Sequence, residues 1–182
     1  MPSLQTSPPP RAAGKIVSRR RLRRILSACR REQRTVVFTN GCFDLLHAGH
    51  VKLLERARRL GDVLVVGLNS DRSVRRLKGP GRPVIKQGDR ALLLAAMDSI
   101  DYVTIFGEAT PARLIASVQP DILIKGADWN ASQIIGADVV RQRRGRIVRF
   151  PVVRGYSTSE IIARIQRSAS TDATTAGDSA AD

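Results

Sequence analysis

Short runs rich in β-branched residues alternate with segments of helical length along most of this chain, and this alternation restricts the possible folds more than any other feature. The runs span residues 36–39, 63–68, 102–106, 121–125 and 147–150. Strands that are joined through helices run parallel, because each helix returns the chain to the same edge of the sheet. The sequence therefore predicts an α/β fold, a Rossmann-like, doubly wound parallel sheet of five strands with helices on both faces.

The two ends of the chain differ in composition from the part between them. Residues 1–14 include three consecutive prolines, and residues 168–182 are almost entirely Ser, Thr, Ala, Gly and Asp. Both compositions are typical of disorder. We therefore predict one domain over residues 15–167, including an N-terminal basic helix, between disordered ends. Without a secretory signal or an apolar run near the ~20 residues that span a bilayer, a cytoplasmic protein without a membrane span is expected.

Positive charge is concentrated near the start of this domain. The net charge is +15, and residues 15–34 hold nine Lys or Arg residues against one acid, Glu32. Within this stretch Leu22, Ile25, Leu26 and Cys29 follow the i, i+3, i+4, i+7 spacing of one helix face. The pattern favours a structural helix with a solvated basic face. Binding of RNA, a membrane surface or another anionic partner stays open, as does an organelle transit peptide.

The loop after the first predicted strand, residues 39–50, is the most informative for function. In parallel sheets ligands bind beyond the carboxyl ends of the strands. Gly41 and Gly49 allow the backbone to approach a ligand, and the amides at the start of the following helix favour an anion. Both histidines of the sequence, His47 and His50, can donate hydrogen bonds to phosphate oxygens. The alternatives are a zinc pair, which would need further ligands, or two packed histidines. No Walker motif or dinucleotide fingerprint is present.

The same loop carries a family resemblance. Residues 41–44 (Gly-Cys-Phe-Asp) and 47–50 (His-Ala-Gly-His) resemble the signature of the cytidylyltransferase-like nucleotidyltransferase superfamily. The likeness extends over about residues 34–167 and is similar in particular to the adenylyltransferase half of bifunctional ADP-heptose synthases, without the sugar-kinase half. It implies transfer of AMP from ATP to D-glycero-β-D-manno-heptose 1-phosphate with Mg²⁺ as cofactor, giving ADP-heptose and pyrophosphate. It also implies a homodimer.

The resemblance assigns roles to particular residues. His47, His50 and Lys78 are implied to be catalytic, and Lys78 and Arg90 to bind the substrate phosphate. Asp44 is expected to order its loop by accepting backbone hydrogens, and no side chain is assigned to a metal. The residues implied to bind the nucleotide are Thr39, Asn40, Gly41, Phe43, Gly49, Lys125, Gly126, Asp128, Ser157, Thr158 and Ser159.

Two helix starts and one departure from the family pattern complete the predictions. Thr110 reads as an N-cap with Pro111 at the first helical position, and Ser157 has capping-box spacing to Glu160. Relatives that use CTP often carry an arginine where this chain has Val152, and a contact between Arg154 and the triphosphate is left open.

Two alternatives to the adenylyltransferase stay open at this point. One is a cytidylyltransferase acting on glycerol 3-phosphate or a similar alcohol phosphate. The other is a protein without enzyme activity that binds RNA or another anion through residues 15–34.

Overall fold

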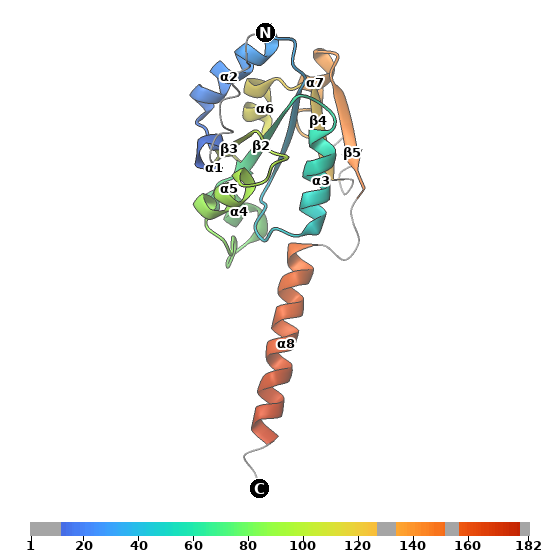
Figure 1. The fold of residues 1–182 in the computed structure, drawn as a ribbon. Helices are drawn as coiled ribbons and strands as arrows, with labels where there is room; N and C mark the ends of the chain where they lie inside the picture. Colours follow the sequence, from blue (N-terminus) through green and yellow to red (C-terminus); the bar gives the residue numbers. More distant parts are fainter. Residues whose placement is uncertain (1–11, 127–133, 152–156, 179–182) are drawn as a thin grey trace, which may run out of the picture.

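The five predicted strands form one parallel sheet, which confirms the predicted fold class (Figure 1). The computed structural model describes residues 12–126, 134–151 and 157–178. The order across the sheet is β3-β2-β1-β4-β5. The strands are β1 (Val36–Gly41), β2 (Val63–Asn69), β3 (Tyr102–Phe106), β4 (Ile122–Gly126) and β5 (Arg146–Phe150).

Helices connect the strands and cover the sheet on both sides (Figure 1). Helices α2, α6 and α7 pack on one face, whereas α3 and α5 pack on the other. The helices within the described ranges are α1 (Ala12–Lys15), α2 (Arg19–Arg31), α3 (Ala48–Arg58), α4 (Asp71–Lys78), α5 (Gln87–Ala95), α6 (Ala112–Val118), α7 (Ala137–Gln142) and α8 (Thr158–Asp178).

The two faces of the sheet explain the runs of apolar residues in the strands. Successive side chains of a strand point to opposite faces. In β1, Val36 and Phe38 therefore join the core beneath α2, α6 and α7, while Val37 joins the core beneath α3 and α5. All seven residues of β2 are buried, as expected for a central strand covered on both faces.

The strand order reverses between β1 and β4, and there the sheet opens. Six residue pairs join β1 to β2, but only two join β1 to β4, Val37 with Ile122 and Phe38 with Leu123. Backbone pairing between β1 and β4 thus does not continue to the carboxyl ends of these strands. This is the position at which open α/β sheets bind their ligands.

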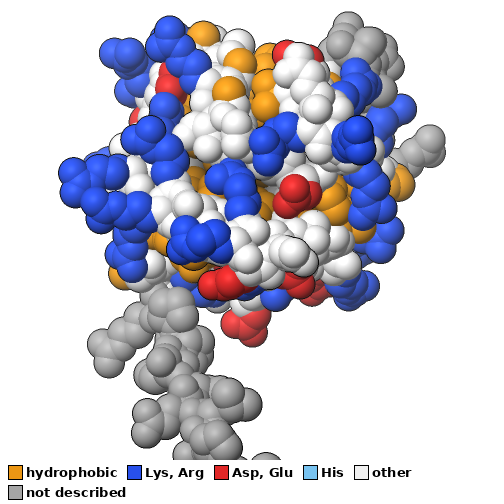
Figure 2. Space-filling view, turned by 90° about the horizontal axis from the view of Figure 1, so that it is seen from above, with side chains coloured by type: hydrophobic (Ala, Val, Ile, Leu, Met, Phe, Trp, Pro, Cys, Tyr) orange, Lys and Arg blue, Asp and Glu red, His pale blue; other side chains and the backbone are white. Residues whose placement is uncertain are grey.

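Helix α2 confirms the predicted amphipathic helix. Leu22, Leu26 and Cys29 are buried against the core, and Ile25 packs at its edge. The Ser18 side chain caps the helix by accepting from the Arg21 amide. Figure 2 shows Lys and Arg side chains gathered on both flanks of the face seen from above.

Helices reach across both predicted domain boundaries. Residues 12–14 belong to α1, and Ala12 packs against the core, so they are ordered, whereas the rest of the predicted N-terminal segment, 1–11, lies outside the described residues. At the other end α8 continues to Asp178, so the stretch from 168 is helical as far as Asp178. Alanine is a strong helix former, and this stretch contains several alanines.

The helix starts also need one correction. Pro111 occupies the N-cap position of α6, and no side chain caps that end, so the helix begins one residue later than predicted. Ser157 does cap α8, because its hydroxyl accepts from the Glu160 amide at 3.1 Å.

Across the described ranges, no helix has both the length and the apolar character that crossing a bilayer requires.

Candidate functional site

A cavity of about 600 Å³ lies at the carboxyl ends of β1 and β4. The histidine loop, residues 42–50, runs through its middle. The loops after β2 and β3 form one wall, and the segments after β4 and β5 form the other. The predicted site residues that line it are Thr39, Asn40, Gly41, Phe43, Asp44, His47, Gly49, His50, Lys78, Lys125, Gly126, Ser157, Thr158 and Ser159.

Several lining residues were not assigned from the sequence. Most are apolar side chains of the two walls, which sequence patterns cannot separate from ordinary core residues. Arg82 lies within a segment that resembles the family but had received no role. The residues added by the structure are Cys42, Leu53, Asn69, Leu77, Arg82, Ala109, Pro111, Ile134, Ile135, Phe150 and Pro151.

The two histidines stack on one another inside the cavity. Their ring centroids are 3.8 Å apart with an interplanar angle of 19°. The Phe43 ring packs on His50 with a centroid distance of 5.0 Å. A Cβ on Gly41 would approach this phenyl ring to 3.1 Å, so a larger residue there would crowd it. The loop thus holds both imidazoles against one another and against an aromatic ring.

This packing lowers the affinity of both imidazoles for protons. Burial, with a smaller contribution from neighbouring His47, lowers the pKa of His50 to about 4. Burial also lowers the pKa of His47, although Glu160 opposes the shift. Both rings are therefore neutral near pH 7, and each has one N–H group to donate. The Nδ1 atom of His50 is buried and finds no hydrogen-bond partner among the described residues.

The start of α3 adds backbone donors to the histidines. His47 is the N-cap residue, but no side chain caps the helix. The first amide that bonds within the helix is that of His50, at 2.9 Å from the His47 carbonyl. The amides of Ala48 and Gly49 precede it and, with the helix dipole, favour an anion at this end.

Lys125 and Asn40 connect the wall after β4 to β1. The Lys125 ammonium donates to the Asn40 carbonyl at 3.2 Å. The Oδ1 atom of Asn40 is buried without a hydrogen-bond partner in the described part of the chain. Unpaired buried polar atoms are costly, so this amide group is a candidate contact for a polar ligand. Asp128, also predicted here, lies outside the described residues, as does Arg154.

The N-terminus of α8 completes the same wall. Ser157, Thr158 and Ser159 line the cavity, and the Thr158 hydroxyl lies 3.5 Å from the Leu45 carbonyl. The predicted group of hydroxyls is therefore brought next to the histidine loop, although Thr158 and Leu45 are 113 positions apart in the sequence.

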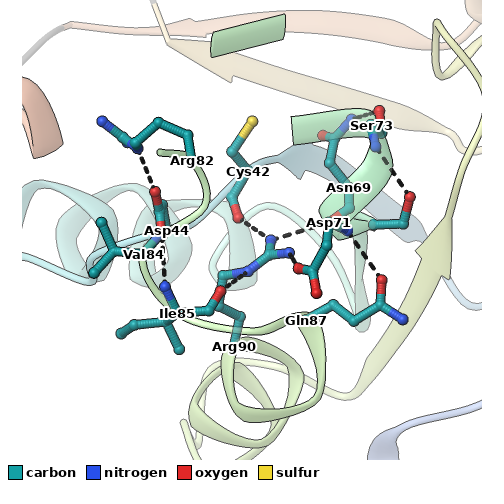
Figure 3. A network of polar contacts seen from close by, with 11 residues as sticks. Cys42, Asp44, Asn69, Asp71, Ser73, Arg82, Val84, Ile85, Gln87 and Arg90 are labelled. Atoms are coloured by element: carbon teal, nitrogen blue, oxygen red, sulfur yellow. Dashed lines mark hydrogen bonds and ion pairs between the residues drawn. The ribbon is translucent and has the colours of Figure 1, made fainter. Parts of the chain in front are cut away.

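Asp44 accepts backbone hydrogens as expected, but from a different loop. Its Oδ1 atom accepts from the amides of Val84 and Ile85 at 2.8 and 3.1 Å. Its Oδ2 atom accepts from Nε of Arg82 at 2.6 Å (Figure 3). Asp44 therefore ties the histidine loop to the segment between α4 and α5.

Arg90 does not reach the cavity, which corrects its predicted contact with the substrate phosphate. The side chain is fully buried. Its guanidinium donates to the carbonyls of Cys42, Asn69 and Ile85 and pairs with Asp71 at 2.7 Å (Figure 3). With all three nitrogens engaged, Arg90 holds together the chain segments that form one wall of the cavity.

Lys78, in contrast, stays exposed at the end of α4 and lines the cavity.

A zinc site is not supported, because the described residues contain no group of three or more His, Cys, Asp or Glu side chains that could hold a metal ion.

Comparisons with known proteins agree with this geometry. A family model described as cytidylyltransferase-like matches residues 38–164. The bifunctional protein HldE of Syntrophotalea carbinolica is 56% identical over 151 residues, which cover 83% of this chain and 31% of that protein. The chain thus spans about a third of the length of the curated relatives that it matches.

Solved structures show the same architecture. The crystal structure of a lipopolysaccharide core biosynthesis protein from Thermoplasma volcanium is 25% identical, with a TM-score of 0.56, and covers 68% of this chain and 99% of that one. Pantoate-beta-alanine ligase from Francisella tularensis has a TM-score of 0.56 at 15% identity, over 76% of this chain and 67% of its own. At that identity the likeness concerns the fold alone.

Proposed function

The chain belongs to the cytidylyltransferase-like family, and from this premise we propose that it is an adenylyltransferase that moves AMP from ATP to D-glycero-β-D-manno-heptose 1-phosphate. The products are ADP-heptose and pyrophosphate. The stacked pair His47 and His50, held neutral at the start of α3, is the observation on which the proposed chemistry rests. The choice of ATP and heptose 1-phosphate is supported by the identity of 56% to bifunctional protein HldE.

The reaction requires little covalent chemistry from the protein. An oxygen of the acceptor phosphate attacks the α-phosphorus of ATP in line. The bond from that phosphorus to the oxygen bridging to the β-phosphate breaks, and its electron pair leaves with pyrophosphate. The protein positions the two substrates and stabilises the charge that develops on phosphate oxygens.

The described site offers donors suited to those tasks. His47, Gly49 and His50, at the start of α3, all line the cavity. Neutral imidazoles leave this region without a fixed charge until a triphosphate enters, and the anion then raises their pKa values and strengthens their hydrogen bonds. Lys78 adds a cation from the wall formed after β2.

Mg²⁺ is expected to enter with the triphosphate and, when bound, to neutralise part of its charge. Asp44 is the one carboxylate among the described lining residues, and it already accepts hydrogen bonds from Arg82 and two backbone amides. This donor set fits an ion that keeps most of its water and is held mainly by substrate phosphates. We therefore assign no protein ligand to the metal.

The test is pyrophosphate release by the full chain with Mg²⁺. ATP and CTP are supplied separately, each with heptose 1-phosphate, other sugar 1-phosphates or glycerol 3-phosphate. We expect release with ATP and heptose 1-phosphate. Release only with CTP would replace the proposed substrates by those of a cytidylyltransferase, and no release with any pair would refute the proposed reaction.

The role of the histidines has its own test. His50→Ala should lower kcat about 10²–10³-fold, as expected for the loss of one donor to a transition-state oxygen. Arg56→Ala, an exposed substitution on the same helix, is the matched control and should keep normal turnover. Near-normal turnover of His50→Ala would remove the histidine pair from the chemistry.

A further inference from the structure

Arg82 lies at the end of a tight turn that carries the chain from α4 back to the cavity. Gly79 and Gly81 adopt φ values of +89° and +76°, which side chains other than glycine rarely tolerate. The turn places Arg82 in the cavity wall, with 17% of its side chain exposed. A charge that is taken out of water is costly unless it is paired.

Asp44 satisfies only one edge of this guanidinium. The Asp44 side chain is 1% exposed and is fixed by the amides of Val84 and Ile85. It accepts a hydrogen bond from Nε of Arg82 at 2.6 Å. The carboxylate therefore sets the orientation of the guanidinium before any ligand arrives.

The outer nitrogens of Arg82 remain available. None of the described residues accepts a hydrogen bond from its two Nη groups, and Figure 3 shows the end of the side chain directed away from Asp44. Arg90, eight residues later, donates from Nε and from both Nη groups to protein acceptors. Of these two arginines, Arg82 is thus the one that can bind a ligand.

We propose that Arg82, oriented by Asp44, binds the phosphate group of the acceptor and holds it for attack on the α-phosphorus; this inference rests on the proposed function. Two neighbouring N–H groups of a guanidinium match two oxygens of a phosphate. The acceptor phosphate is itself an anion and must approach another anion, so Arg82 and Lys78 would reduce the repulsion between them.

The position of Arg82 favours the acceptor phosphate over the triphosphate. Arg82 and Lys78 lie on the wall formed after β2, on one side of the histidine loop. The opposite wall holds the apolar side chains of Ile134 and Phe150, which suit a nucleotide base, together with the hydroxyls at the start of α8. Two substrates that react across the histidines are expected to approach from opposite walls.

The test compares Arg82→Gln and Arg82→Lys with the wild type in steady-state pyrophosphate release. Arg75→Gln is the matched control, because Arg75 is an exposed residue of the neighbouring helix α4 and does not line the cavity. Arg82→Gln should raise KM for the acceptor about 10–100-fold, in line with the loss of a charge-assisted contact, and leave KM for ATP within about twofold. Arg82→Lys should give a smaller rise in the same parameter, because it keeps the charge but loses the paired N–H groups.

A binding measurement separates this inference from the proposed reaction. Inorganic phosphate and ATP with Mg²⁺ are titrated separately into the full-length wild type and variants, without turnover. Weaker binding of phosphate by Arg82→Gln with unchanged binding of ATP would support the inference even if no acceptor is turned over. Three results would overturn the inference. The first is a raised KM or weaker binding for ATP alone, and the second is no change in KM or binding for either substrate. The third is no binding of phosphate by the wild type. Thermal unfolding checks that the variants are folded. If Arg82→Gln is not folded, the comparison is made with Arg82→Lys.

Discussion

Arginine is used in opposite ways behind the cavity and on helix α2. Behind the cavity, the fully buried guanidinium of Arg90 makes four hydrogen bonds to four residues. On α2, six of seven arginines are exposed, and the seventh, Arg19, is half-buried and pairs with Glu108. The larger concentration of charge therefore lies on an exposed surface, while two buried charges with several partners, Arg90 and Asp44, hold the cavity wall together. The number of partners that each charge has distinguishes the two regions.

The largest expected effect is the loss of the buried guanidinium. Arg90→Met should lower the free energy of unfolding by about 3–5 kcal/mol, because Asp71 and three backbone carbonyls lose their partner at once. Arg24→Met on α2 changes the same side chain at an exposed position and should change this free energy by less than about 0.5 kcal/mol. Urea unfolding of both variants measures the difference. Equal effects of the two substitutions would show that the Arg90 network does not organise the structure.

The titration of His50 gives a smaller effect in the same region. Its pKa is about 4 in the folded protein, against an ordinary value of 6.5. Below pH 6.5 the unfolded chain takes up a proton that the folded chain refuses, so the contribution to stability is present above pH 6.5 and is lost as the pH falls toward 4. The difference amounts to at most about 3 kcal/mol.

The measurement is the free energy of unfolding at several pH values between 7 and 4. His50→Gln, which cannot take up this proton, should show a shallower loss of stability over that window than the wild type. Arg24→Gln on α2 should leave the slope unchanged, because an arginine stays charged throughout. A wild-type slope equal to that of His50→Gln would mean that His50 is not held neutral by burial.

Sequence patterns identified the strands and the histidine loop because both depend on local signals. The β-branched runs and the spacing of Gly41, His47, Gly49 and His50 are visible along the chain. All five predicted strands are found within one or two residues of their expected bounds, and the buried face of α2 was predicted residue by residue.

The direction of single side chains was harder to predict. Arg90 was expected to contact phosphate, yet it lies on the buried face of α5 with Leu94, four residues later. That i, i+4 spacing was the available signal, but a buried arginine is rare enough that exposure is the natural expectation. Arg82 and Asp44 meet across 38 residues of sequence, and no local pattern records such a pairing.

The smallest expected effect belongs to the exposed face of α2, which carries Arg20, Arg23 and Arg24. Replacing all three by Gln keeps a good helix former at each position, so we expect pyrophosphate release within about twofold of the wild type and a loss of stability below about 1 kcal/mol. Leu26→Ala, on the buried side of the same helix, is the contrast and should cost about 2–5 kcal/mol. Titration with a single-stranded RNA oligonucleotide at several salt concentrations completes the experiment. Tight RNA binding that weakens steeply with salt and disappears in the triple variant would show that this helix has a function of its own. The arginines that now face solvent would then be contacts for the RNA.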